Sequence, residues 1–356
     1  MSFIEDKKSK VNEVFSELLV SWQKQFGRHG LPWQVNNPYW IWVSEVMLQQ
    51  TQVSTVKEYF PKFIRAFPDL KSLAEAKEET VLKYWAGLGY YSRAKNLHTS
   101  ARFLNTNYGQ NFPSTRAEWQ QLKGIGRSTA AAIVAFAFQR KEAILDGNVK
   151  RVLARLFALY IDVAQSSSQK ILWELSENLL PANSEHMPAY TQGLMDLGAM
   201  VCLKKKPRCL KCPVHNLCQA YKRGQVDYFP VINRRITLKK IDYFWPLVIT
   251  DSAQLMVFER EAKGIWSGLL TPPTFETKVQ MLKWLKENAL DTNTLVFLCT
   301  LVHKLTHREL SIHLFRLVVD SIPQINKGMF YPISELRDER VPKPFKMVLS
   351  GKYLMD

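Results

Sequence analysis

The sequence has no long hydrophobic run, no internal repeat and no low-complexity tract. No stretch reaches the roughly 18 apolar residues of a membrane span. The first ten residues are charged and lack the apolar core of a secretory signal. We therefore expect a soluble, intracellular protein with no membrane partner. Because 46% of the 356 residues are hydrophobic, a disordered chain is excluded, and the length favours two domains.

Acidic residues are scarce relative to basic ones. The chain has 32 Asp and Glu against 48 Lys and Arg, which gives a net charge of +16. The basic residues are interleaved with aromatics and do not gather in one tail, so the surface attracts polyanions. Nucleic acid is the leading partner, and a solvated cationic face is the alternative.

Cysteine is also rare, and four of the five lie close together in the sequence. The cluster consists of Cys202, Cys209, Cys212 and Cys218. In a reducing compartment this grouping indicates a metal centre, and zinc or a 4Fe-4S cluster would fit. A zinc ribbon has two C-x2-C pairs, whereas this run has one, which favours iron–sulfur. The lysine-rich chain between these cysteines is too polar to be core.

Apolar periodicity divides the chain into two parts. Residues 1–225 have helical spacing throughout, with Asn37 and Pro38 predicted to begin a helix. Residues 226–240 are polar and basic and predict a linker. Residues 241–356 contain strand-like runs at 243–250, 254–260, 295–302 and 310–319, with one helix near 279–289. We expect a mainly α domain followed by an α+β domain.

A short glycine turn, with Gly124 and Gly126, lies between a helical stretch at 116–122 and an alanine-rich helix at 130–138. The glycines allow close approach of a ligand, and the amides at the start of the second helix could bind a DNA phosphate. An ordinary connector between two helices is the alternative reading.

Two carboxylates are candidate catalytic groups. Glu45 lies within an apolar helical run, where burial would raise its pKa and let it donate a proton; an exposed helix position is the alternative. Asp146 opens the segment LDGNV directly before a helix, whose dipole should lower its pKa, although it could be a simple N-cap. An acid beside a carboxylate suits N-glycosidic cleavage through an oxocarbenium-like state.

With these features in order, the chain resembles the helix–hairpin–helix DNA glycosylases that carry a 4Fe-4S cluster. The motifs LPW (31–33), WVSEVMLQQTQV (42–53) and GLGYYSR (87–93) are similar to the adenine-specific MutY family. The resemblance covers about two-thirds of the chain. It implies base excision repair of adenine mispaired with 8-oxoguanine or guanine in double-stranded DNA, by a monomer. The chain length and the absence of a targeting segment lead us to expect a bacterial, cytoplasmic, nucleoid-associated enzyme.

The resemblance also implies residue roles. Glu45 would protonate adenine, and Asp146, assisted by Asn148, would stabilise the oxocarbenium ion. Gln50, Leu88 and Tyr90 match positions that wedge into the opened duplex, which partly offsets the cost of flipping the base. Three further positions match lesion or adenine contacts: Thr51 near 8-oxoguanine, and Trp33 and Gln192 in the adenine pocket.

Ser128 stands in the hairpin where related strand-cutting enzymes have a Schiff-base lysine, so little lyase activity is expected. The C-terminal part resembles a Nudix-like 8-oxoguanine recognition domain, without the acidic pairs that bind magnesium. Thr306 and His307 occupy the place of the family's Ser-His, and Leu305 replaces a phenylalanine. A lyase-active glycosylase for oxidised pyrimidines and a non-catalytic DNA-binding iron–sulfur protein are the competing readings.

Overall fold

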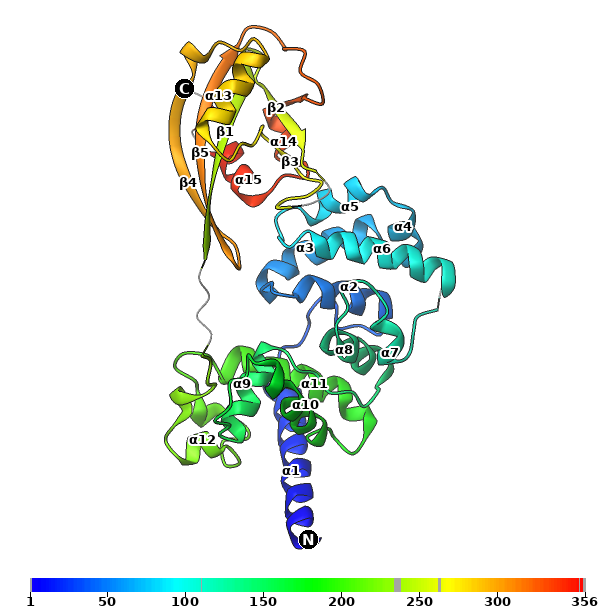
Figure 1. The fold of residues 1–356 in the computed structure, drawn as a ribbon. Coiled ribbons are helices and arrows are strands. Elements are labelled where there is room, and N and C mark those ends of the chain that lie inside the picture. Colours follow the sequence, from blue (N-terminus) through cyan, green and yellow to red (C-terminus); the bar gives the residue numbers. More distant parts are fainter. Residues whose placement is uncertain (1, 110, 234–237, 262–263, 352, 355–356) are drawn as a thin grey trace. The chain divides into compact units, whose positions relative to one another are not determined.

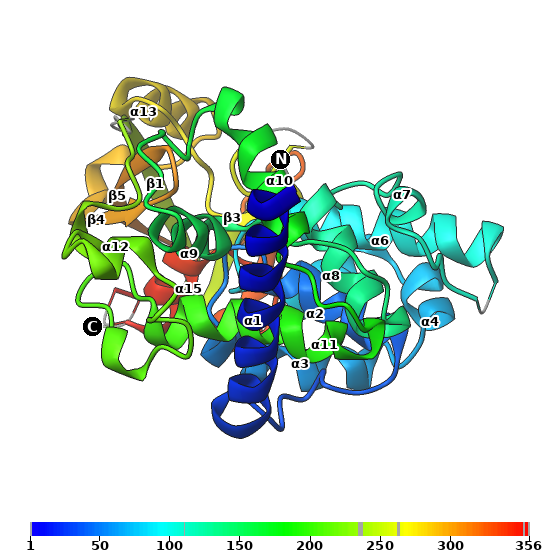
Figure 2. The same cartoon turned by 90° about the horizontal axis from the view of Figure 1, so that it is seen from below.

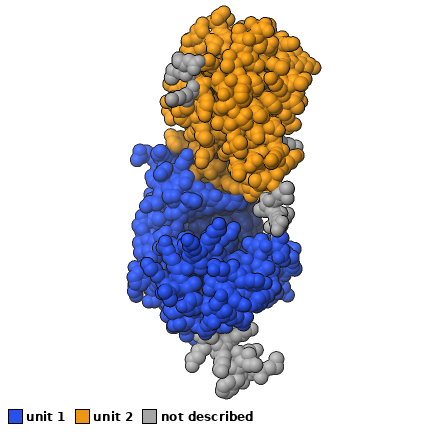
Figure 3. All heavy atoms as spheres, turned by 90° about the vertical axis from the view of Figure 1, so that its left-hand side faces the viewer, with its two compact units in different colours: residues 1–74, 99–234 blue, residues 75–98, 235–356 orange. Residues whose placement is uncertain are grey.

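The fold comes from a computed structural model that describes residues 2–109, 111–233, 238–261, 264–351 and 353–354. The chain divides into two compact units (Figure 3). Unit 1 comprises residues 1–74 and 99–234, and unit 2 comprises residues 75–98 and 235–356. The segment 75–98 thus belongs to the same unit as the C-terminal sheet. Residues 234–237 of the expected linker lie outside the described residues.

The first two-thirds of the chain is helical, as the apolar spacing predicted. The helices are α1 (Ser2–Phe26), α2 (Pro38–Leu48), α3 (Val53–Ala66), α4 (Leu70–Glu75), α5 (Glu78–Trp85), α6 (Ser92–Asn107), α7 (Arg116–Trp119), α8 (Arg127–Phe138), α9 (Gly147–Leu156), α10 (Gln169–Asn178), α11 (Met187–Asp196) and α12 (Gln219–Lys222). A π-helical turn, Leu197–Val201, extends α11. The predicted helix at 116–122 is shorter than expected, because α7 ends at Trp119.

Local capping fixes where the functional helix α2 begins. The Asn37 side chain accepts hydrogen bonds from the backbone amides of Tyr39 and Trp40, and Pro38 occupies the first helical position. Proline is suited to that position because its missing N–H would have no partner there. The prediction of this cap is confirmed, and the helix that carries Glu45 is thereby held in register.

Helix α1 packs along α11 in the core of unit 1 (Figure 2). Gly193 of α11 makes the close approach possible, since a Cβ there would lie 3.1 Å from the Leu19 side chain. The surrounding core is closed by Phe15, Val149, Leu153, Leu172, Tyr190, Leu194 and Leu197. This packing places the end of α1 beside the end of α11, where polar side chains meet.

Unit 2 is built on a mixed sheet. Its strands are β1 (Lys239–Thr250), β2 (Gln254–Glu259), β3 (Leu270–Thr271), β4 (Val296–Lys304), β5 (Arg308–Val319) and β6 (Met329–Pro332). Their order is β3-β2-β1-β5-β4, with β6 paired to β2. Strands β1 and β5 run parallel, and the other pairs are antiparallel. The four predicted strands are therefore confirmed, each within a few residues.

Helices pack against both faces of this sheet (Figure 1). The remaining helices of unit 2 are α13 (Lys278–Glu287), α14 (Ile333–Leu336) and α15 (Lys343–Ser350). Met281 of α13 packs with Val248 on one face, and Phe345 of α15 meets the Trp245 ring on the other, with centroids 5.8 Å apart. The observed architecture is a helical N-terminal domain followed by an α+β domain. Among the described residues, no helix is long and apolar enough to cross a membrane.

Candidate active site

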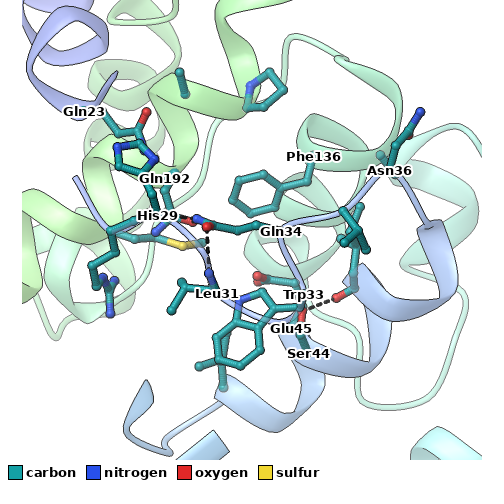
Figure 4. A pocket seen from close by; sticks show the side chains of 18 of the residues that line it. Gln23, His29, Leu31, Trp33, Gln34, Asn36, Ser44, Glu45, Phe136 and Gln192 are labelled. Atoms are coloured by element: carbon teal, nitrogen blue, oxygen red, sulfur yellow. Dashed lines mark hydrogen bonds between the residues drawn. The ribbon is translucent and has the colours of Figure 1, made fainter. Parts of the chain in front are cut away.

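A pocket of about 880 Å³ opens in unit 1 beside the carboxyl group of Glu45. Its walls include Leu31, Trp33, Ser44, Phe136 and Gln192 (Figure 4). The Trp33 ring is buried and meets Phe60 edge-on, with centroids 5.5 Å apart. The pocket therefore combines aromatic and amide groups, which suits a flat, hydrogen-bonding ligand such as a nucleobase. Trp33, Glu45 and Gln192, which the sequence placed at the site, come together here.

Glu45 is buried on α2, with 9% of its surface exposed. Burial, and to a smaller extent the negative charge of Asp146, raises the pKa of its carboxyl from 4.5 to about 8. The carboxyl is thus protonated at neutral pH and can act as an acid. The reading of Glu45 as an exposed helix residue is excluded.

A polar network that sequence reasoning missed closes one end of the pocket. Asp196, fully buried on α11, accepts hydrogen bonds from the Arg28 amide at 2.7 Å and from Arg28 Nε at 2.6 Å. Gln192 Nε2 also donates to Asp196, at 2.8 Å. Gln34 Nε2 then donates to Gln192 Oε1 at 3.4 Å (Figure 4). The amide of Gln192 is therefore held in one orientation toward the pocket.

The signal for this network was present but weak. Gln192 and Asp196 are four residues apart on α11 and so share a helix face. Arg28, however, is 168 residues away from Asp196 in sequence. Nothing local indicates that pairing.

Asp146 is the N-cap of α9, and its Oδ1 accepts the Val149 amide at 2.7 Å. Capping and a catalytic role are compatible here, because Asp146 is also close enough for its charge to act on Glu45. Ser128 supports this segment, since its Oγ accepts the Leu145 amide at 2.9 Å. In this structure the Ser128 hydroxyl is therefore a support for the backbone before Asp146.

Asn148 lies in the first turn of α9, and its Oδ1 accepts from Arg151 Nη2 at 3.0 Å. Gly198, in the π-helical turn, packs directly on it: a Cβ added to Gly198 would lie 2.6 Å from the Asn148 Cβ. Real Cβ atoms do not approach so closely, so one of the two segments would have to move.

We therefore expect Gly198→Ala to displace Asn148 and the start of α9. Overpacking of this kind costs about 1–3 kcal/mol of stability. Thermal unfolding followed by circular dichroism should show a lower Tm, and single-turnover base excision should slow. Gly147→Ala is the control, because no atom of the described residues beyond its chain neighbours and its own helix backbone lies within 4 Å of a Cβ at Gly147. An unchanged Tm for Gly198→Ala would contradict the tight packing.

The glycine hairpin precedes α8. Gly124 has a φ of 80°, a left-handed conformation that favours glycine, and Gly126 is the exposed N-cap of α8. Gly126 has no side chain that could cap the helix, so the N-cap residue does not occupy the first amides of α8. Gln49 Nε2 donates to Gly124 O at 3.2 Å. Arg127 pairs with Glu177 and is thereby turned toward α10.

The four clustered cysteines line one small cavity beside α9. Arg155, almost fully buried, points at them, with Nη1 3.3 Å from Cys202 Sγ. The Cys218 thiol lies 3.3 Å from the Arg155 carbonyl. Burial raises the pKa of the Cys212 thiol to about 12 when no metal is bound. Four thiol groups and one buried guanidinium therefore come together at this cavity.

The remaining predicted residues lie on loops. Gln50 and Thr51 follow α2, and Gln50 is exposed with a φ of 58°. In unit 2, Tyr90 is 45% exposed with a φ of 48°, whereas Leu88 is buried. Left-handed conformations at such residues are strained and often functional. Leu88 would have to leave its buried position to act as a wedge.

Thr306 and His307 lie in the turn between β4 and β5. The Thr306 hydroxyl is hydrogen-bonded to the Tyr90 hydroxyl. The structure therefore joins two residues that the sequence assigned to DNA contacts for separate reasons. The His307 carbonyl accepts the Lys239 amide at 3.1 Å, which fixes the turn to the start of β1.

Comparison with known proteins agrees with this geometry. Residues 43–178 match the family described as HhH-GPD superfamily base excision DNA repair protein, and residues 244–351 match the NUDIX domain. The chain is 34% identical to an adenine DNA glycosylase of Buchnera aphidicola over 95% of its own length and 96% of the relative. It is 41% identical to the Mus musculus adenine DNA glycosylase over 61% of this chain and 44% of that one.

The fold of the helical part is shared with a solved structure, a thermostable thymine-DNA glycosylase. That protein is 30% identical, with a TM-score of 0.54, and the match covers 62% of this chain and 99% of that one.

Proposed function

We propose that this chain, which belongs to the adenine DNA glycosylase family, excises adenine mispaired with 8-oxoguanine or guanine in base excision repair. The observation that supports this most directly is the buried Glu45 carboxyl with its raised pKa. It lines a pocket large enough to admit a base, and Asp146 is near enough for its charge to contribute to that pKa. One acid and one carboxylate are the groups that cleavage of an N-glycosidic bond requires.

In the proposed mechanism, Glu45 donates its proton to a ring nitrogen of the flipped adenine, and N7 is the acceptor. Protonation makes the base a neutral leaving group, and positive charge develops on the sugar. The Asp146 carboxylate then stabilises this oxocarbenium-like charge, with Asn148 beside it. Water then adds to the anomeric carbon of the sugar and releases a proton to solvent, which completes hydrolysis. Glu45 lies in the middle of α2 and Asp146 caps the start of α9, so the backbone of each carboxyl group is held in place by a helix.

We assign recognition of adenine to the polar network at the end of the pocket. Gln192 can donate and accept hydrogen bonds at once, as the edge of adenine requires. Its orientation is fixed by Asp196 at 2.8 Å, and Asp196 is fixed by Arg28. Trp33 supplies a flat apolar surface beside Glu45 (Figure 4).

We assign recognition of the base opposite adenine to residues of unit 2. The linked hydroxyls of Tyr90 and Thr306 supply a donor and an acceptor at an exposed turn. Thr306 keeps the hydroxyl that the family usually has in serine at this place, and the neighbouring Leu305 lacks an aromatic ring for stacking. The exposed Tyr90 ring can supply stacking instead.

We further propose that the four cysteines hold a 4Fe-4S cluster. Among the described residues, no three His, Cys, Asp or Glu groups are close enough to hold a single metal ion. The four thiols nevertheless surround one cavity, which suits a larger polynuclear group. The Arg155 charge offsets the negative charge of the thiolates. Such a cluster would fix the lysine-rich loop 203–211, which can meet DNA phosphates.

The raised pKa of Glu45 predicts a specific pH dependence. Excision should fall as pH rises through about 8, because the proton that Glu45 donates is lost. Glu45 keeps its proton up to about pH 8 in the folded protein but loses it near pH 4.5 in the unfolded chain. The free energy of unfolding should therefore decline as pH rises from about 4.5 to 8. Rates and Tm measured from pH 5 to 9.5 test this. The same decline in Glu45→Gln would contradict it.

Single-turnover excision on duplexes with one 8-oxoguanine:adenine, guanine:adenine or thymine:adenine pair tests the function. We expect adenine release from the first two, and strand breaks after alkaline but not neutral work-up, because Ser128 cannot form a Schiff base. Rapid borohydride trapping of most of the protein on DNA would contradict a monofunctional enzyme, and binding without adenine release would support a non-catalytic protein. We propose action as a monomer in the bacterial cytoplasm, on nucleoid DNA.

A further inference from the structure

Segment 75–98 is tied to the C-terminal domain by charged and polar contacts within unit 2. Lys83 Nζ of α5 lies 2.7 Å from Glu339 Oε1, which raises the pKa of Lys83. Arg340, with a side chain 9% exposed, lies 3.8 Å from Glu79 of α5 and 3.0 Å from Glu259 of β2. The buried guanidinium therefore joins α5 to the sheet.

Two further lysines contribute to this attachment, one from segment 75–98 and one from the C-terminal domain. Lys95 of α6 donates to Ser267 Oγ at 3.1 Å, and Lys346 of α15 donates to the Ala86 carbonyl at 3.3 Å. Gly268 fits closely against the same segment, since a Cβ there would lie 3.2 Å from the Leu82 side chain. Single exposed pairs contribute little, but this set surrounds α5 and includes a buried charge.

The loop after α5 is in turn held rigidly to it. Trp85 Nε1 donates to the Gly89 carbonyl at 3.2 Å, and the Gly87 amide donates to the Tyr91 hydroxyl at 3.2 Å. Arg93 Nη2 donates to the Gly89 carbonyl at 3.1 Å and stands over the Trp85 ring. The position of Tyr90 is therefore set by α5, and the position of α5 is set by the C-terminal domain.

We propose that Lys83 and Glu339 are positioning residues that couple recognition of the base opposite adenine to opening of the duplex. Tyr90 is a candidate wedge residue, and its hydroxyl is hydrogen-bonded to that of Thr306. The loop after α5 and the turn between β4 and β5, to which we assign recognition of the opposite base, are thereby connected. This inference rests on the proposed function. It adds that the C-terminal domain also positions the loop after α5, whose residue Tyr90 would enter the DNA.

The test is a charge swap in the full-length protein. Glu339→Lys should lower the ratio of single-turnover excision from 8-oxoguanine:adenine over guanine:adenine by about three- to fivefold. Lys83→Glu should do the same. The double variant should recover at least half of the decrease in this ratio. Glu339→Gln should lower the ratio less than Glu339→Lys does. Glu287→Lys, which breaks the exposed Lys283 pair on α13, is the matched control.

Hydrogen exchange of the amides of residues 86–91 gives a readout independent of activity. Exchange should rise in Glu339→Lys and return in the double swap, while that of β1 and β5 stays unchanged. A ratio unaffected by either single variant, or unrestored by the swap, would overturn the coupling. If the unmodified protein releases no adenine, the proposed function fails; if it does and the ratio is unaffected, this inference alone fails.

Discussion

Replacing Glu45 with glutamine should slow single-turnover adenine excision by about 10³-fold or more, with little loss of DNA binding. Proton donation by one side chain contributes about 10²–10⁴ to rate. Glutamine keeps the shape of the side chain but cannot supply a proton to the base. Excision rates under enzyme excess and affinity for a duplex with an uncleavable adenine analogue give the two quantities.

The matched control for this variant is Glu58→Gln, at an exposed position on α3. It makes the same change from carboxyl to amide on the neighbouring helix and should leave excision unchanged. Glu45→Gln should also unfold at a higher Tm than the unmodified protein above pH 8, because the cost of ionising a buried carboxyl is gone. A loss of less than tenfold in rate would show that another group protonates the base.

Asp146→Asn should lower excision by about 10³-fold while the fold is kept. Asparagine is as good an N-cap as aspartate, so the bond to the Val149 amide at 2.7 Å can persist. The charge that stabilises the oxocarbenium-like state is lost, and removing one preorganised electrostatic group costs about 10²–10³ in rate. The measurement is the single-turnover rate together with Tm.

This variant also has a second signature in pH. The charge of Asp146 is the second cause of the raised Glu45 pKa, after burial. Without that charge the pKa of Glu45 falls, so the residual activity should decline at a lower pH than in the unmodified protein. Asp291→Asn, which changes the exposed cap of a short turn in unit 2, should alter neither rate nor pH profile. An unshifted profile in Asp146→Asn would show that the two carboxyl groups do not interact.

Much of the fold was predictable because its signals are local. The Asn37 cap, the glycine turn at 124–126 and the alternating strands all depend on neighbours within a few residues. Val279 shows the limit of such patterns: it has helical spacing in α13, yet its side chain is 76% exposed. Which apolar positions face the core is decided by the element that packs against them.

The candidate site divides in the same way. The sequence by itself determined the residue types: two carboxylates, a glycine hairpin, four closely spaced cysteines and an excess of positive charge. The tertiary structure alone decided the pairing of Arg28 with Asp196, the support of Leu145 by Ser128 and the attachment of segment 75–98 to the C-terminal sheet. It also decided the pKa of Glu45. Burial and electrostatic interactions depend on distance in space, and distance between residues far apart in sequence exists only once the chain has folded.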